Sequence, residues 1–176
     1  MTPRRPLLLD LDRSLAVLLT FAANRLNSTG SAAYRAKLGL GITEVRLLIM
    51  LAVEPDIVAA RICEVMGIDT GAASRTLREM EGRGLVRQRR DPHNRAYRRW
   101  TLTPAGDALH DQAVTIALER DRILTAAMTT EERDLMIDLL KRILARTPDL
   151  AALVQASGEP AVMRPDKGPK SLHSRR

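Results

Sequence analysis

The 176-residue chain lacks several features that would place it in other protein classes. It has a single cysteine, Cys63, which rules out an internal disulfide and a cysteine-based zinc cluster. Aromatic residues make up 2% of the chain, so stacking platforms for single-stranded nucleic acid are largely missing. No run approaches the roughly 18 apolar residues of a membrane span, and Asp10, Asp12 and Arg13 interrupt the N-terminal apolar stretch. We expect one soluble cytoplasmic domain without membrane contact.

Catalytic and metal-binding motifs are missing as well. The three histidines, His93, His110 and His173, are too far apart for a metal-ligand spacing. No phosphate-binding glycine loop, HExxH or GxSxG occurs, and helix capping explains Thr129 and Glu132. We therefore expect no enzyme activity, no cofactor and no metal. We interpret Cys63 as a small buried packing residue.

The chain does have an excess of arginine. Its 28 basic residues include four lysines, leaving 28 − 4 = 24 arginines, and the net charge is +7. Between residues 75 and 99, nine arginines stand against three acids, a local balance of 9 − 3 = +6. A solvated basic face is one explanation. Because arginine suits phosphate and guanine, and because this segment has a regular architecture, double-stranded DNA is the favoured partner.

Hydrophobic periodicity predicts helices on both sides of this basic segment. A leucine stripe from residue 8 to residue 26 indicates a long first helix, which Asn27–Gly30 should weaken or break, with a shorter helix over 32–38. Thr43 is the expected cap of the next helix, whose Val45, Leu48 and Leu51 face inward. Further helices are expected over 57–66, 70–83, 104–128 and 129–147, with Thr103 capping the one that starts at Pro104.

The central segment has the pattern of a DNA-binding unit. Residues 85–86 and 97–102 form strands joined by a turn at 91–94, which makes a small basic β-hairpin. In the helix over 70–83, Ala73, Leu77 and Met80 should face the core, so that Gly71, Ser74, Arg75 and Arg78 face outward. Such a helix fits the major groove, where arginine can bond guanine. The expected fold is mainly α with a small β-hairpin wing, a winged helix-turn-helix.

Four stretches resemble the MarR family of bacterial transcription regulators. They are residues 67–75, 80–87, 91–95 and 102–106, with a "GLV" triplet and an "LTPAG" sequence at matching spacing. The resemblance implies a MarR-like domain over 7–147, with a DNA-binding lobe at 43–102. It also implies a homodimer formed through helices at 7–38 and 104–147. Residues 1–6 are then a flexible N-terminus, and 157–176 a basic, disordered tail.

The resemblance also implies the DNA-binding residues. The helix at 70–83 would read the major groove while the wing touches the minor groove, and Arg95 matches the family's wing arginine. Its usual companion acid is replaced by Asn94, and the arginine that often follows is replaced by Ala96. Arg98 and Arg99 alternate along a strand, so only one of them can face DNA. The expected site is Thr70, Gly71, Ala72, Ser74, Arg75, Arg78, Arg90, Asn94, Arg95 and Arg98.

Three functions fit this reading. The first is a repressor that binds a pseudo-palindromic operator as a homodimer and is released by a small-molecule effector, which the family often holds between its dimerisation helices and DNA-binding lobe. The second is an architectural DNA-binding protein of low specificity, suggested by the basic tail. The third is a winged-helix module for protein contact, against which the arginines of the wing argue. The sequence does not name an effector.

Overall fold

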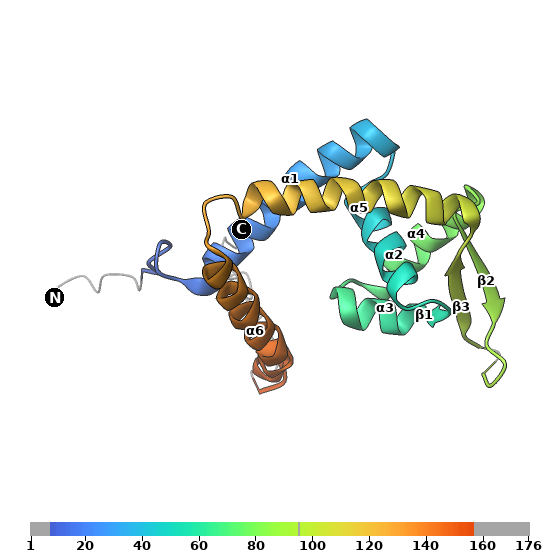
Figure 1. The fold of residues 1–176 in the computed structure, drawn as a ribbon. Coiled ribbons are helices and arrows are strands. Elements are labelled where there is room, and N and C mark those ends of the chain that lie inside the picture. Colours follow the sequence, from blue (N-terminus) through green and yellow to red (C-terminus); the bar gives the residue numbers. More distant parts are fainter. Residues whose placement is uncertain (1–7, 95, 157–176) are drawn as a thin grey trace, which may run out of the picture. The chain divides into compact units, whose positions relative to one another are not determined.

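The computed structural model describes residues 8–94 and 96–156, so Arg95 and the predicted flexible N-terminus and tail lie outside the described residues. Clustering of contacts gives two compact units, one up to Leu124 and one from Thr125 onward. The elements run in the order shown in Figure 1: α1 (Leu15–Leu38), α2 (Ile42–Val53), β1 (Ile57–Val58), α3 (Ala59–Met66), α4 (Thr70–Gly82), β2 (Val86–Arg90), β3 (Arg98–Leu102), α5 (Pro104–Leu124) and α6 (Thr130–Ala156).

The sheet is the predicted hairpin with one additional strand. Its order is β1-β3-β2, and both pairings are antiparallel. The helix predicted from residue 57 was wrong at its start, because Ile57 and Val58 pair with Trp100 and Arg99 of β3 and α3 begins only at Ala59. Ile57 and Val58 are β-branched residues, which favour strands, and here they pair with the backbone of β3. One more turn of helix would leave that edge of β3 unpaired. The order α3, α4, β2, β3 is that of a winged helix-turn-helix.

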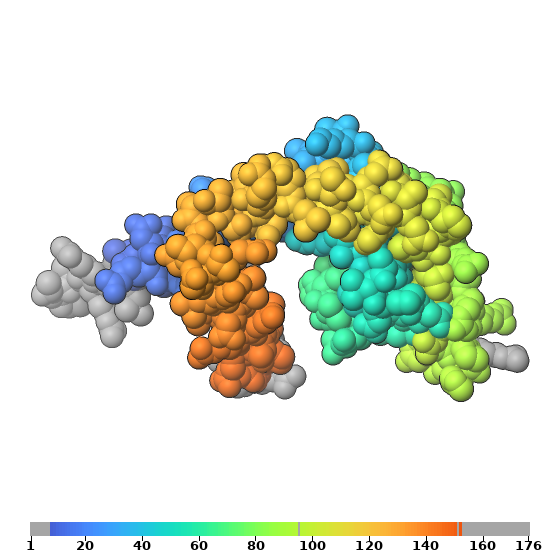
Figure 2. Space-filling model, viewed as in Figure 1, coloured from blue at the N-terminus to red at the C-terminus, as the bar shows by residue number. Residues whose placement is uncertain are grey.

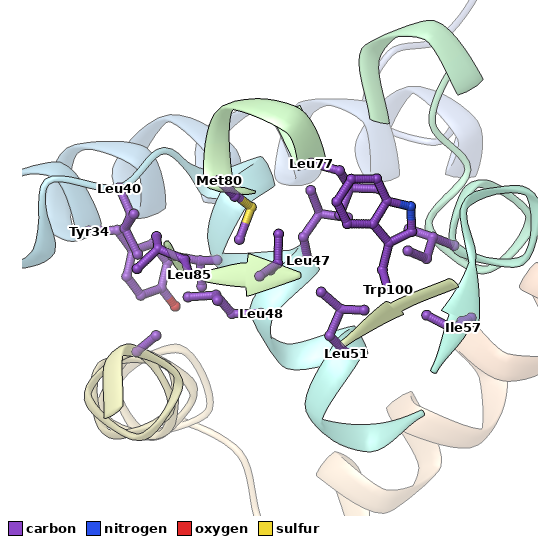
Figure 3. Packing of buried hydrophobic residues seen from close by; sticks show 14 residues of the cluster. Tyr34, Leu40, Leu47, Leu48, Leu51, Ile57, Leu77, Met80, Leu85 and Trp100 are labelled. Atoms are coloured by element: carbon purple, nitrogen blue, oxygen red, sulfur yellow. The ribbon is translucent and has the colours of Figure 1, made fainter. Parts of the chain in front are cut away.

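The core of the first unit forms around α2 (Figure 3). Val45, Leu48 and Leu51 are buried as predicted, and Leu47 joins them on this helix. α4 contributes the predicted Ala73, Leu77 and Met80, and β3 contributes Trp100. α5, yellow in Figure 2, packs on α2 and on α1. The buried side of α4 therefore fixes which of its side chains face outward.

The first helix is one element, so the predicted break at Asn27–Gly30 was wrong, as was its start near residue 8. α1 begins at Leu15 and runs through Gly30 to Leu38. Gly30 is buried, and a Cβ there would lie 3.0 Å from the guanidinium of Arg120 on α5. That guanidinium donates to the Leu26 carbonyl at 2.8 Å. Tertiary packing against α5 thus offsets the low helix propensity of this segment.

Helix ends follow the capping signals in part. Thr103 caps α5 as predicted, since its Oγ1 accepts from the Gly106 N–H at 3.1 Å. Thr43 is not the cap of α2, which begins at Ile42 after Gly41. There the Glu44 carboxylate, at the third position of the helix, accepts from the N–H of the N-cap residue Gly41 at 2.6 Å, which is the glutamate half of a capping box.

The last two helices end elsewhere than predicted. α5 stops at Leu124 and not near Met128, whose N–H instead closes a turn onto Thr125. The predicted capping box of α6 is confirmed, because the Thr129 N–H reaches Glu132 and the Glu132 N–H reaches Thr129.

α6 then continues past Pro148, where the sequence predicted its end. Proline removes the hydrogen bond that the Leu144 carbonyl would accept, and the Thr147 hydroxyl donates to that carbonyl at 2.8 Å.

Candidate nucleic-acid interface

α4 presents a small, arginine-bearing outer face. Asp69 caps the helix by accepting from the Ala72 N–H at 2.9 Å, which starts α4 at Thr70. Because Ala73, Leu77 and Met80 are fully buried, the opposite side of the helix is open to a partner. On it, four of the predicted residues are exposed and two are half-buried: Thr70, Gly71, Arg75 and Arg78, then Ala72 and Ser74.

The wing has two faces of different character. The register places Arg89 opposite Arg99 and Arg90 opposite Arg98. Since neighbouring residues of a strand point to opposite sides, these are separate pairs on separate faces, as predicted for Arg98 and Arg99. Trp100 lies on the same face of β3 as Arg98 and is buried. This face of the hairpin is therefore the one that borders α4.

The structure brings α4 and the wing together around one groove of about 400 Å³. Four of the predicted site residues line it: Thr70, Ser74 and Arg78 from α4, and Arg98 from β3. Gly71 and Arg75 lie outside this groove on exposed positions of α4. Arg90 lies at the end of β2, exposed. Helix and strand thus each place one arginine, Arg78 and Arg98, in a shared groove.

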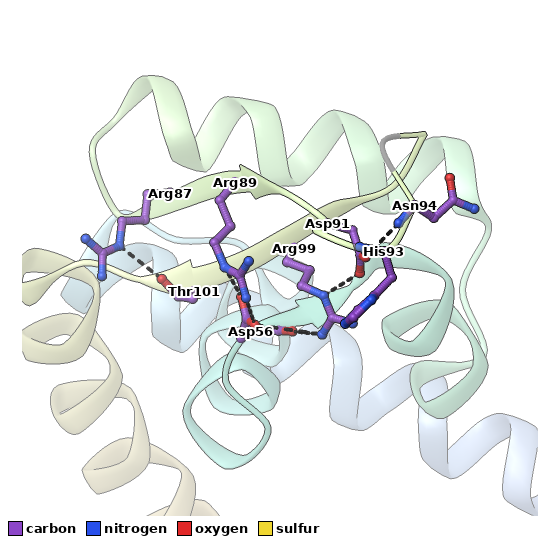
Figure 4. A network of polar contacts seen from close by, with 8 residues as sticks. All are labelled: Asp56, Arg87, Arg89, Asp91, His93, Asn94, Arg99 and Thr101. Atoms are coloured by element: carbon purple, nitrogen blue, oxygen red, sulfur yellow. Dashed lines mark hydrogen bonds and ion pairs between the residues drawn. The ribbon is translucent and has the colours of Figure 1, made fainter.

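Asp91 organises the wing turn (Figure 4). This buried carboxylate accepts from the N–H groups of His93 at 2.7 Å and Asn94 at 3.0 Å, and from the Arg99 guanidinium. These bonds, that from His93 first, lower the pKa of Asp91 to about 2. Asn94 is itself occupied, since its side-chain oxygen accepts from the Ala96 N–H at 3.0 Å. Asn94 therefore shapes the turn.

A second acid, Asp56, holds the root of the wing. Its carboxylate binds the Arg89 guanidinium at two points, with Arg89 Nε 2.8 Å from Asp56 Oδ1 (Figure 4). The same carboxylate lies 3.8 Å from Arg99 Nη1, which also donates to the Asp56 carbonyl at 2.9 Å. No sequence pattern predicts this contact, because Asp56 and Arg89 are 33 residues apart and Asp56 lies outside the strand that contains Arg89.

These contacts divide the arginines of the basic segment. Arg83 pairs with Glu44, and Arg89 and Arg99 are engaged by the two wing aspartates. Within the described part of the chain, Arg75, Arg90 and Arg98 make no ion pair and no side-chain hydrogen bond. All three were predicted as site residues. They remain available to phosphates and bases.

Comparisons with known proteins agree with this geometry. A family model described as the MarR family matches residues 38–96, from the end of α1 into the wing. Over this segment the chain is similar to the MarR family. The matches support a transcriptional regulator with a DNA-binding fold of the MarR type, which agrees with the expectation that it is no enzyme.

Individual relatives extend over more of the chain. An uncharacterised HTH-type transcriptional regulator, YdgJ of Bacillus subtilis, is 28% identical over 113 residues, or 62% of this chain and 67% of the relative. A MarR/EmrR family regulator from Acinetobacter sp. ADP1 superimposes with a TM-score of 0.75 at 27% identity, covering 80% of this chain and 99% of that one. An uncharacterised SlyA-like regulator from Listeria monocytogenes, 17% identical, gives 0.74 over 85% and 99%. These matches confirm the predicted fold class.

Two further features lie outside the nucleic-acid interface. A cleft of about 280 Å³ opens between α1, α2 and α5, lined by Leu26, Tyr34 and Ile49 together with the guanidinium groups of Arg46 and Arg120. In the described residues no helix combines the length and apolar character of a membrane span.

Cys63 is half-buried on α3, so the expectation of a buried packing residue holds only in part.

Proposed function

We propose that this protein is a MarR-type repressor that binds a pseudo-palindromic operator as a homodimer. The observation that carries the proposal is the groove shared by α4 and the wing, which the unpaired Arg98 lines, together with the unpaired and exposed Arg75 on α4 and Arg90 on β2. A helix with small residues and arginine near its N-terminus fits the major groove, while wing arginines reach phosphates. A mutant of MarR from E. coli, 21% identical with a TM-score of 0.66, has been crystallised with operator DNA.

The homodimer is supported by apolar side chains left uncovered in each unit. α1 exposes Leu15, Leu18 and Phe21, and α6 exposes Leu135 and Leu144, each by more than two fifths. Side chains of this size at helical spacing are normally covered by another apolar surface. A second copy of the chain supplies such a surface, and two-fold symmetry matches the two halves of an operator.

We further propose that the cleft between α1, α2 and α5 receives the effector. Arg120 lies over the Tyr34 ring, 5.8 Å from its centre, and Arg46 donates to Asn27 at the opposite wall. Arg46 and Arg120 share the cleft with one acid, Asp121, so its charged lining carries a net positive charge. A largely apolar cleft with this balance suits an organic anion with an apolar body. The PcaV regulator of Streptomyces coelicolor, 20% identical with a TM-score of 0.66, has been crystallised with its natural ligand.

A competition gel shift tests the DNA function. The probe is the promoter DNA adjoining the protein's own gene, at near-physiological salt, against random duplex of equal length. We expect a preference of about a thousandfold or more. Binding without preference would favour the architectural function, and no binding would favour a protein partner.

Two variants separate base reading from phosphate contact. Arg75→Ala should relax the preference at one or two base pairs, because its guanidinium stands free on the outer face of α4. Arg98→Ala should weaken binding to all sequences and reduce the salt dependence. Identical effects of the two changes would refute this division.

Release by the effector is tested with organic anions added to the operator complex. Ligands that carry a carboxylate on an aromatic or aliphatic body should dissociate it, and Arg46→Met should weaken release without loss of DNA binding, because Arg46 is exposed at the cleft. An uncharged analogue is the matched control, since it lacks the group that the two guanidinium groups would bind. Equal release by both compounds would contradict the proposed role of the arginines.

A further inference from the structure

Asp56 occupies the left-handed region of the backbone at the turn before β1. Its φ is 62°, and among the described residues it is the one non-glycine residue with positive φ. Glycine adopts this left-handed region freely, and asparagine and aspartate tolerate it better than most residues with a Cβ. The turn therefore accepts aspartate, and the contacts of the carboxylate show what this side chain adds.

The position of Asp56 lets it act on both strands of the wing. It directly precedes β1 at one edge of the sheet, while Arg89 lies on β2 at the other edge, with β3 between them. The Arg89 side chain crosses β3 to reach the carboxylate, beside Arg99 on the same face. Two like charges placed directly opposite each other destabilise a strand pair. Asp56 offsets that repulsion for Arg89 and Arg99.

The other arginine pair of the hairpin is left without such an acid. Arg90 and Arg98 stand opposite each other on the second face, and within the described ranges neither forms an ion pair. Arg98 lines the groove shared with α4. The wing therefore has one neutralised arginine pair and one free pair, and the neutralised pair lies on the face turned away from the groove.

We propose that Asp56 is a specificity-determining residue, which holds Arg89 and so limits sequence-independent binding to DNA. This inference rests on the proposed function. An arginine released from Asp56 should raise the affinity most for random duplex, because there the protein can shift until the side chain reaches a phosphate. It should raise the affinity less for an operator, because there the contacts of α4 fix the position of the wing. Arg99 stays fixed without the Asp56 carboxylate, because Asp91 and the Asp56 carbonyl also hold it.

The test measures binding of the full chain to two duplexes of equal length over a salt series. One duplex is random, and the other is selected from a random library by the wild-type protein. Asp56→Asn keeps a residue that tolerates the turn, and Asp56→Gly removes the backbone strain altogether. For both we expect random-duplex affinity to rise about fivefold near 0.15 M salt, with a salt slope steeper by about 0.9, the value of one phosphate contact. The preference for the selected duplex should fall accordingly.

Two further variants isolate the cause. Glu119→Gln breaks the exposed Glu119–Arg122 pair on α5 and adds the same charge, so it should leave random-duplex binding nearly unchanged. Arg89→Gln in the Asp56→Asn background should restore wild-type affinity for random duplex.

The inference is overturned if both Asp56 variants keep the wild-type affinity and salt slope on random duplex, or if Glu119→Gln raises affinity as much as they do. Failure of the proposed function is a different result, in which the wild-type protein shows no preference for its selected duplex.

Discussion

The junction of the wing with α5 gives the sharpest stability prediction, at Gly106. A Cβ at this position would lie 2.0 Å from the Leu85 carbonyl oxygen and 3.1 Å from its carbon. The contact is with backbone, and the same carbonyl accepts from the N–H and hydroxyl of Thr103 at 3.1 and 3.2 Å. No side-chain rotation can relieve the clash. Gly106→Ala must therefore move the first turn of α5 away from the start of β2.

The expected cost follows from two opposed effects. Alanine favours a helix over glycine by about 1 kcal/mol, whereas forcing a methyl group into a packed site costs about 1–3 kcal/mol and more against backbone. We expect a net loss of about 2 kcal/mol in the free energy of unfolding. With a urea dependence of about 1–3 kcal/mol per molar, the unfolding midpoint should fall by about 1 M.

Gly82→Ala is the matched control for this measurement. Gly82 ends α4, and a Cβ there would meet no atom within 4 Å. Its unfolding midpoint should stay at or slightly above the wild-type value, because alanine restricts the unfolded chain. A Gly106→Ala protein as stable as the wild type, with the same urea dependence, would refute the steric argument.

Three further changes extend these predictions, each measured by urea unfolding. Leu47→Ala should cost about 2–5 kcal/mol, since Leu47 is fully buried in α2 and leaves a cavity. Thr103→Ala removes the cap of α5 and should cost about 1 kcal/mol. Because the pKa of Asp91 is lowered from 3.8 to about 2, its charge stabilises the fold above about pH 4, and this contribution is lost as the pH falls through 2. Asp91→Asn should thus destabilise at pH 7, and the difference from wild type should narrow toward pH 2.

Local signals predicted most of the elements correctly. The spacing of Ala73, Leu77 and Met80 gave the buried side of α4, and Thr103 and the Thr129–Glu132 pair gave two helix starts. The errors came where a contact with a residue distant in the sequence determines the secondary structure. Gly30 stays helical because Arg120 of α5 packs on it, and Ile57 is a strand residue because Trp100 pairs with it.

The site divides in the same way. Periodicity sufficed to place Arg75 and Arg78 on the outer face of α4, and strand alternation separated Arg98 from Arg99. Asp56 neutralises Arg89, although the two residues lie far apart in the chain. A count of charged residues between 75 and 99 therefore overstated the number of free arginines in the wing. Arg95 lies outside the described residues, and its role stays a prediction.

The length of α5 has a mechanical consequence. One end of this 21-residue helix is wedged under the wing at Gly106, and the other end walls the cleft through Arg120 and Leu124. At 1.5 Å per residue the helix is a rod of about 30 Å, and a tilt of about 5° moves one end by roughly 2.5 Å relative to the other. A molecule that enters the cleft and tilts α5 would therefore shift the start of β2 by nearly the width of an atom. Such a shift would be enough to move the wing arginines away from the phosphates that they are proposed to contact.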